Sequence, residues 1–195
     1  MTLCLLVPAA GSGTRFLGAG HKLAARIAGD SVLALTLRQA SATGLRVMLV
    51  ISARLHDEMG DALPACEQVV VDTDANPGWG MGDSIAAGVA ATPDAAGWLV
   101  LPADMPFVRL DSIHRVAAGL AGHAVAYARH VGRRGHPVAF RASLKDELLA
   151  LRGDSGARAV VARADSVAVD VDDDGTLLDI DTLDDLDAAR RHAAA

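Results

Sequence analysis

The sequence is short of several kinds of residue, and each shortage excludes a class of protein. Its two cysteines, Cys4 and Cys66, provide neither a disulfide framework nor a metal-ligand spacing. No apolar run approaches the roughly 20 residues of a membrane-spanning helix, and residues 3–10 lack the basic start of a signal peptide. A net charge of −6 disfavours nucleic-acid binding, which needs a basic face. We therefore expect a cytoplasmic protein that binds neither membranes nor nucleic acids.

Apolar runs alternate with helical patterns along the chain. This alternation predicts an α/β fold, a three-layer sandwich whose mostly parallel sheet is covered by helices on both faces. Its 195 residues are typical of one domain, so we expect a single domain over residues 1–195. The predicted strands span residues 3–7, 46–52, 68–72, 98–101, 124–128 and 166–171, and the predicted helices span 31–42, 55–63, 83–91 and 111–120, with a last helix ending at 192.

The first predicted strand leads into a loop rich in glycine and positive charge. Gly11 and Gly13 allow a sharp turn whose backbone N–H groups can approach a ligand closely. Arg15 and Lys22 add two full positive charges to the same segment. In parallel sheets, ligands bind beyond the carboxyl ends of the strands, where this loop begins. The segment therefore predicts a phosphate-binding site.

Neither of the two common phosphate motifs fits this loop. A Walker A loop requires Gly-Lys-Ser/Thr, whereas Lys22 stands between His21 and Leu23. The dinucleotide fingerprint requires Gly or Ala at its third glycine position, and here the pattern leads to Phe16 instead. The loop therefore indicates a different kind of nucleotide site.

Asp104 follows the predicted strand at 98–101, in the segment Leu-Pro-Ala-Asp-Met-Pro-Phe. A carboxylate between two prolines just past a buried strand lies at the ligand-binding edge of the sheet. Mg²⁺ is usually held by one or two carboxylates together with substrate phosphates. We therefore predict that Asp104 binds Mg²⁺, with a turn or helix-cap aspartate as the alternative.

Two further segments carry candidate binding residues. The glycine-rich loop at 76–84 opens a predicted helix whose first N–H groups are free to bind a ligand. Residues 129–137 place three arginines and two histidines together in an acidic protein. Because arginine forks match phosphate oxygens, this segment favours a clamp for an anionic acceptor. A solvated turn is the alternative.

Residues 8–15 read Pro-Ala-Ala-Gly-Ser-Gly-Thr-Arg and are followed by Lys22. This stretch resembles the Leu-Ala-Ala-Gly-x-Gly-x-Arg opening of nucleotidyltransferases with the Rossmann-like nucleotide-diphospho-sugar transferase fold, although Pro8 and His21 depart from the commoner residues. The resemblance implies that the loop wraps a nucleoside triphosphate and that Asp104, in an Asp-x-Pro segment, holds the metal. The residues so implied are Ala9, Ala10, Gly11 and Gly13 in the loop, and Arg15, Lys22 and Asp104 as catalytic groups.

Three later segments resemble one branch of that family, the MobA-like molybdenum cofactor cytidylyltransferases. They are Asn-Pro…Gly-Met-Gly-x-Ser at 76–84, Gly-His-Pro at 135–137 and Leu-Leu-x-Leu-x-Gly-Asp-x-Gly-Ala-Arg at 148–158. The resemblance implies a nucleotide-binding half at about 1–108 and an acceptor-binding half at about 109–195. It assigns nucleotide contacts to Asn76, Gly82 and Ser84, acceptor contacts to Arg133, Arg134 and His136, and a second metal carboxylate to Asp179 or Asp181.

The predicted activity is that of a Mg²⁺-dependent cytidylyltransferase, which transfers CMP from CTP to the terminal phosphate of molybdopterin and releases pyrophosphate. Three alternatives stay open at this point. They are a guanylyltransferase that uses GTP, a sugar-phosphate or alditol-phosphate nucleotidyltransferase, and a cofactor-binding chaperone for molybdoenzymes without enzymatic activity. Transient contact with a recipient molybdoenzyme or its chaperone is a further expectation.

Overall fold

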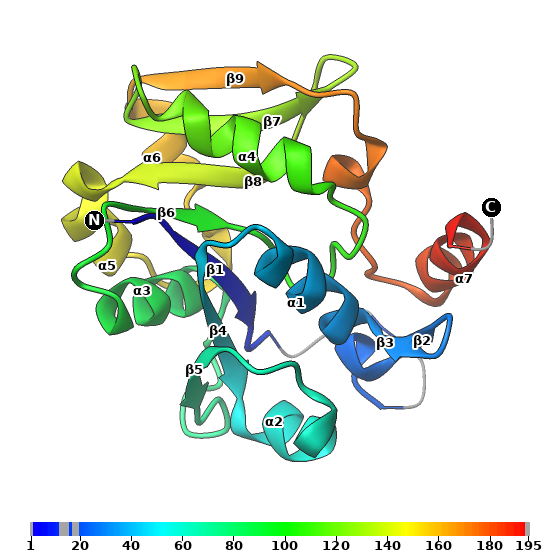
Figure 1. The fold of residues 1–195 in the computed structure, drawn as a ribbon. Coiled ribbons are helices and arrows are strands. Elements are labelled where there is room, and N and C mark those ends of the chain that lie inside the picture. The colour runs from blue at the N-terminus through cyan, green and yellow to red at the C-terminus, as the bar shows by residue number, and fades with distance from the viewer. Residues whose placement is uncertain (1, 12–15, 17–19, 194–195) are drawn as a thin grey trace.

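The computed structural model describes residues 2–11, 16 and 20–193 of the chain (Figure 1). Within these residues, seven strands form one sheet in the order β5-β4-β1-β6-β8-β7-β9. All of them run parallel except β8, which is antiparallel to both of its neighbours. The strands are β1 (Cys4–Ala9), β4 (Arg46–Ser52), β5 (Glu67–Val71), β6 (Gly97–Val100), β7 (Val125–His130), β8 (Arg133–Arg141) and β9 (Ser166–Asp170), and a separate small hairpin pairs β2 (Arg26–Ile27) with β3 (Asp30–Ser31).

Helices cover both faces of the sheet, which confirms the predicted three-layer α/β architecture. Side chains of β1 alternate between two buried clusters, with Leu5 and Val7 in one and Cys4 and Leu6 in the other. The first cluster packs under α1 (Val32–Ala42), α2 (Ala53–Met59), α4 (Leu110–Gly119) and α7 (Leu183–His192), and the second under α3 (Met81–Ala91), α5 (Lys145–Leu149) and α6 (Arg158–Arg163). Figure 1 shows α1 and α4 in front of the sheet.

Local sequence signals account for several of these boundaries. The Ser31 hydroxyl caps α1 by accepting a hydrogen bond from the Ala34 N–H at 3.1 Å. Thr182 and Asp185 cap α7 reciprocally. Short 3-10 turns complete the connections: η1 (Lys22–Ala24), η2 (Gly60–Ala62), η3 (Ala142–Leu144), η4 (Gly153–Ser155) and η5 (Asp174–Leu177).

The basic segment at 129–137 is not a turn. It contains the end of β7, a tight connection at 131–132 and the start of β8, so that His130 pairs with Arg133 in an antiparallel hairpin. The rest of β8 pairs with β6, where Val138 lies opposite Val100. A search for apolar runs does not detect the start of this strand, because it contains two arginines, a glycine and Pro137. Because β8 is reversed, its first residues reach the edge where the parallel strands end.

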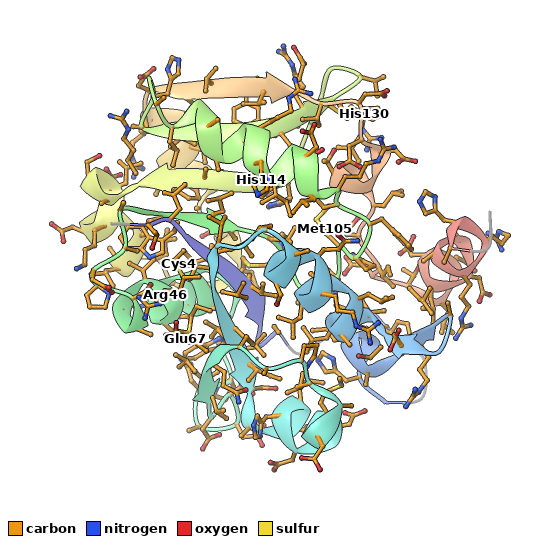
Figure 2. All side chains as sticks on the ribbon, in the orientation of Figure 1. Cys4, Arg46, Glu67, Met105, His114 and His130 are labelled. Carbon is orange, nitrogen blue, oxygen red and sulfur yellow. The ribbon has the colours of Figure 1, made fainter. Side chains whose placement is uncertain are left out.

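The two edges of the sheet differ in character (Figure 2). At the amino-terminal edge, Arg46 donates two hydrogen bonds to Glu67, at 2.7 and 2.8 Å, and so ties β4 to β5. Met105, after β6, and His130, at the end of β7, mark the opposite edge. In an open α/β sheet that carboxyl-terminal edge is where ligands bind. Within the described ranges, no helix has the length and apolar character to cross a membrane.

Candidate functional site

A cavity of about 910 Å³ opens at the carboxyl-terminal edge of the sheet. Its walls come from the ends of β1 and β6, the start of β8, the loops before α3 and α6, and the chain after η5. Some of these segments lie far apart in the sequence, and the fold brings them together at one place. The predicted site residues that line the cavity are Ala9, Gly11, Lys22, Ser84, Asp104, Arg133, Arg134, His136, Asp179 and Asp181.

Three other predicted residues that the structure describes, Ala10, Asn76 and Gly82, are not part of this lining. Gly13 and Arg15 lie outside the described residues. Ala10 is buried behind the end of β1. Asn76 is exposed and accepts a hydrogen bond from the Gly78 N–H at 3.3 Å.

Gly82 is buried in α3, and a side chain there would come within 2.9 Å of the Arg152 backbone nitrogen. The structure thus gives Gly82 a packing reason to lack a side chain. The two residues that precede Gly82, Gly80 at the N-cap of α3 and Met81, still border the cavity.

Lys22 forms the centre of an ionic cluster inside the cavity. Its Nζ donates hydrogen bonds to Asp104 Oδ2 and Asp181 Oδ1, both at 2.6 Å. The three side chains are only 13%, 17% and 21% exposed, respectively. Burial disfavours the charged form of Lys22, but the charge of Asp104 and the hydrogen bonds to both carboxylates outweigh it and raise the Lys22 pKa. Lys22 is therefore charged and holds two carboxylates in place.

Backbone contacts bring the last part of the chain to Asp104. The Ile180 N–H donates to the Asp104 carbonyl oxygen at 3.1 Å, which places Asp179 and Asp181 on either side of this contact. Further back, Gly175 packs so tightly against the Phe107 carbonyl that a side chain there would clash. The segment before α7 is thereby fixed to the loop that follows β6, and three carboxylates meet at one end of the cavity.

These carboxylates suit a divalent cation. Asp104 Oδ1 is buried and has no hydrogen-bond partner in the described part of the chain, so it offers a hard oxygen ligand. No set of three or more acidic, histidine or cysteine side chains among the described residues is arranged as a metal centre. Two carboxylates with substrate oxygens are a usual way to bind Mg²⁺. The carboxylate oxygens at this end of the cavity therefore fit a bound Mg²⁺ ion.

Asp179 and Asp181 differ in their surroundings. Asp181 is bound to Lys22, whereas Asp179 keeps much of its surface in solvent. Partial burial, followed by the negative charges of Asp104 and Asp181, raises the pKa of Asp179. A cation at this end of the cavity would relieve that repulsion. Both residues remain candidates for the second carboxylate.

His21 has a structural role that the sequence did not suggest. Its Nδ1 accepts a hydrogen bond from the Leu23 N–H at 3.2 Å, so Nε2 carries the proton and donates to the Gly11 carbonyl at 3.0 Å. Burial lowers the pKa of His21, which keeps the ring neutral. The side chain therefore joins the end of β1 to the turn that carries Lys22. In the sequence, the feature that could have indicated this role is the position of His21 directly before Lys22.

Ser84 and Trp79 both line the cavity and are hydrogen-bonded to each other. The buried Ser84 hydroxyl donates to the Gly80 carbonyl at 3.1 Å and accepts from Trp79 Nε1 at 2.9 Å. Its hydrogen bonds are thus made within the loop, and its effect is to orient the Trp79 ring, which lines the cavity. The sequence analysis gave Trp79 no role. An aromatic residue in a glycine-rich loop of a chain with 3% aromatics was the signal.

Asp83 connects the two sides of the cavity. Its buried Oδ2 accepts hydrogen bonds from the Gly80 N–H at 3.0 Å and from the Gly153 N–H at 2.8 Å. Gly80 lies so close to the Gly153 backbone that any side chain would clash. The loop before α3 is therefore attached to the loop that precedes Arg158, another cavity residue to which the sequence analysis gave no role.

The start of β8 contributes the remaining polar groups. The Arg134 guanidinium carbon lies 4.8 Å from the centre of the Tyr127 ring, a cation–π contact that positions it. His136 Nδ1 is buried without a hydrogen-bond partner among the described residues. Burial lowers the pKa of His136, and the charge of Asp104 opposes this shift. A neutral imidazole thus lines the same cavity as the arginines and the carboxylates.

The fold and this cavity define a nucleotidyltransferase, and comparisons with known proteins agree. The chain belongs to the family with a MobA-like NTP transferase domain, which matches residues 5–168. A comparison with curated proteins gave no match.

Solved structures share the fold over nearly the whole chain. Rv0371c from Mycobacterium tuberculosis H37Rv is 25% identical, with 98% of both chains covered and a TM-score of 0.83. A nucleotidyl transferase from Methanothermobacter is 22% identical, covering 99% of this chain and 98% of that one, with a TM-score of 0.82. The molybdopterin-guanine dinucleotide biosynthesis protein A of Archaeoglobus fulgidus is 20% identical, covering 100% and 99%, with a TM-score of 0.69.

Proposed function

We propose that this protein transfers CMP from CTP to the terminal phosphate of molybdopterin. One phosphate oxygen of the acceptor attacks the α-phosphorus of CTP, and the bond from that phosphorus to the β-phosphate oxygen breaks. The products are the dinucleotide form of the acceptor and pyrophosphate. The observation that carries the proposal is the cluster of Lys22, Asp104 and Asp181 in the same cavity as Arg133, Arg134 and His136.

The residues of the chain divide the work between two substrates. The backbone at Gly11, with Gly13 and Arg15 from the sequence motif, binds the triphosphate together with Lys22. Arg133, Arg134 and His136 bind the anionic acceptor. The attacking phosphate is ionised at neutral pH, so no protein base has to remove a proton. Positioning and charge neutralisation are then sufficient for transfer.

Asp104, with Asp179 or Asp181, would hold Mg²⁺. The ion, when bound, supplies Lewis-acid polarisation and neutralises charge on the phosphates. Rv0371c has been crystallised as a complex with manganese, which supports a divalent cation in a relative of similar fold. We expect Lys22 to exchange its contacts with the carboxylates for contacts with the phosphates once nucleotide is bound.

GTP is the second candidate nucleotide. The Archaeoglobus fulgidus relative is named for molybdopterin-guanine dinucleotide biosynthesis, and its fold is shared. The choice between the bases rests on the loop at 76–84, whose resemblance to the cytidylyltransferase branch favours CTP.

The decisive experiment incubates the protein with CTP or GTP, Mg²⁺ and molybdopterin, and measures pyrophosphate and the nucleotide product by mass spectrometry. Asp104→Asn should lower turnover roughly 10²–10³-fold, the usual loss on removing one electrostatic stabiliser. Asp111→Asn, an exposed carboxylate on α4, is the matched control. Nucleotide binding without pyrophosphate release would instead favour a cofactor-binding chaperone.

A further inference from the structure

Two arginines from different parts of the chain line the same cavity. Arg134 belongs to the start of β8 and Arg158 is the first residue of α6, and both line the cavity. After burial, which is the largest cause, the positive charge of Arg158 contributes to lowering the pKa of Arg134. Two positive charges therefore lie within electrostatic reach of one another.

Neither arginine has an acidic partner in the described part of the chain. The contrast is Arg129 on the same hairpin, which donates two hydrogen bonds of 2.6 Å to Asp170. Both arginines are exposed residues that line the cavity. Their positive charge remains available to a ligand.

Both arginines are attached to positions that the fold fixes. Arg134 stacks on the Tyr127 ring at 4.8 Å. The loop before Arg158 is held by Asp83 through the Gly153 N–H. Gly156 has a φ of +55° and approaches the Met81 side chain, which is possible without strain only for glycine. The segments that carry the two arginines are thus fixed by contacts with the rest of the fold.

The charged side chains that line the cavity differ in how they are paired. Lys22 is already matched to Asp104 and Asp181, whereas no ion pair joins either arginine to Asp104 or Asp179 in the described residues. Burial is the largest cause of the lowered His136 pKa. Among the charged side chains, Asp104 raises this pKa, whereas Arg134 and Arg158 lower it.

We infer that Arg134 and Arg158 form an anion subsite for a second anionic group of the acceptor, separate from the phosphate that attacks the nucleotide. This inference rests on the proposed function for the reaction at the carboxylate end. It identifies the acceptor class as a phosphate monoester that carries another anionic group at its far end. Sugar phosphates with uncharged far ends leave both arginines unsatisfied and are poorer acceptors.

The first test uses Arg158→Gln, which removes the charge and keeps a long polar side chain. The KM for molybdopterin should rise roughly 10- to 100-fold, as expected for loss of one charge-assisted contact, while the KM for CTP is unchanged. Arg158→Lys should recover part of the loss. The matched control is Arg163→Gln on the same helix, where the arginine is exposed and paired with Glu147 at 3.1 Å.

The second test does not depend on the acceptor. Sodium sulfate is titrated into the protein, and the Nε–H signals of its arginines are followed by nuclear magnetic resonance. The signals of Arg134 and Arg158 should shift together, and Arg158→Gln should weaken the response of Arg134. Arg163→Gln should leave that response intact.

The two tests separate the inference from the proposed function. Turnover of molybdopterin with an unchanged KM in Arg158→Gln, and no joint response to sulfate, would overturn the subsite and leave the proposed reaction standing. A joint response to sulfate without any turnover of molybdopterin would support the subsite and remove the proposed acceptor.

Discussion

Replacing Lys22 by Met tests the ionic cluster at the centre of the site. The substitution keeps an unbranched side chain of similar length but removes the ammonium that donates at 2.6 Å to both Asp104 and Asp181. It leaves two carboxylates, 17% and 21% exposed, facing each other without their shared cation. The folded state therefore loses attraction and gains repulsion in one step.

The size of this loss follows from the partial burial of the cluster. A charge-assisted hydrogen bond contributes about 1.5–3 kcal/mol, and breaking a fully buried pair costs about 3–5 kcal/mol. Since all three side chains retain some contact with water, we expect Lys22→Met to lower the free energy of unfolding by about 2–4 kcal/mol in metal-free buffer. Added Mg²⁺ should return part of this loss, because the freed carboxylates bind the ion more tightly than in the wild type.

Urea unfolding in buffer with a chelator, and again with Mg²⁺, measures both effects. Lys145→Met is the control, because the Lys145 Nζ donates a hydrogen bond to the Pro93 backbone carbonyl at 3.1 Å and forms no ion pair with a carboxylate in the described part of the chain. A loss of less than about 0.5 kcal/mol would show that the cluster behaves as a surface ion pair, and the reasoning from burial would be wrong. Equal stabilisation of the wild type and of Lys22→Met by Mg²⁺ would show that the ion does not bind to these carboxylates.

Four further substitutions test the surroundings of the cluster. Asp181→Asn and Asp179→Asn should separate the second metal carboxylate from its neighbour, because only the true ligand should lower turnover roughly 10²–10³-fold; equal effects in a pyrophosphate-release assay would argue against a single second ligand. Asp83→Ala should raise the KM values for nucleotide and acceptor together, since it releases the loops on both sides of the cavity; an unchanged pair of values would reject this coupling. His136→Gln should reveal a titration: because burial holds the folded-state pKa below its ordinary value of 6.5, the stability advantage of wild type over the variant is complete above that pH and is lost as the pH falls through the folded-state pKa. Urea unfolding at about pH 8 and about pH 5 measures it, and a constant difference between the proteins would contradict it.

The regular parts of the fold could be predicted because their signals are local. The strand at 46–52 is an apolar run and matches β4, and the Ser31 cap marks the start of α1. The start of β8 could not be recognised in this way, because its partners are β6 and β7 and its own residues are basic. Its β structure comes from tertiary pairing rather than from an apolar pattern.

The site could be predicted in its membership more than in its contacts. Asp104 and Lys22 stood out by their positions after predicted strands, and both line the cavity. The contact of Lys22 with Asp181 spans 159 residues of sequence, so no local pattern encodes it. The hydrogen bonds of the Ser84 hydroxyl with Trp79 and with the Gly80 carbonyl depend on side-chain packing, which no local sequence pattern shows.

The reversed strand β8 has a consequence for how acceptor preference could evolve. Residues 138–140 of this strand are buried between β6 and β7 and hold the core together, whereas Arg133 and Arg134 at its start are exposed. One short hairpin thus combines a constrained half with a freely variable half. Under the proposed function, substitutions at 133–134 would alter which acceptor is bound while the proposed nucleotide end, built from β1 and the loop after β6, keeps its chemistry. The fold in this way allows new acceptors to be recruited to an unchanged reaction.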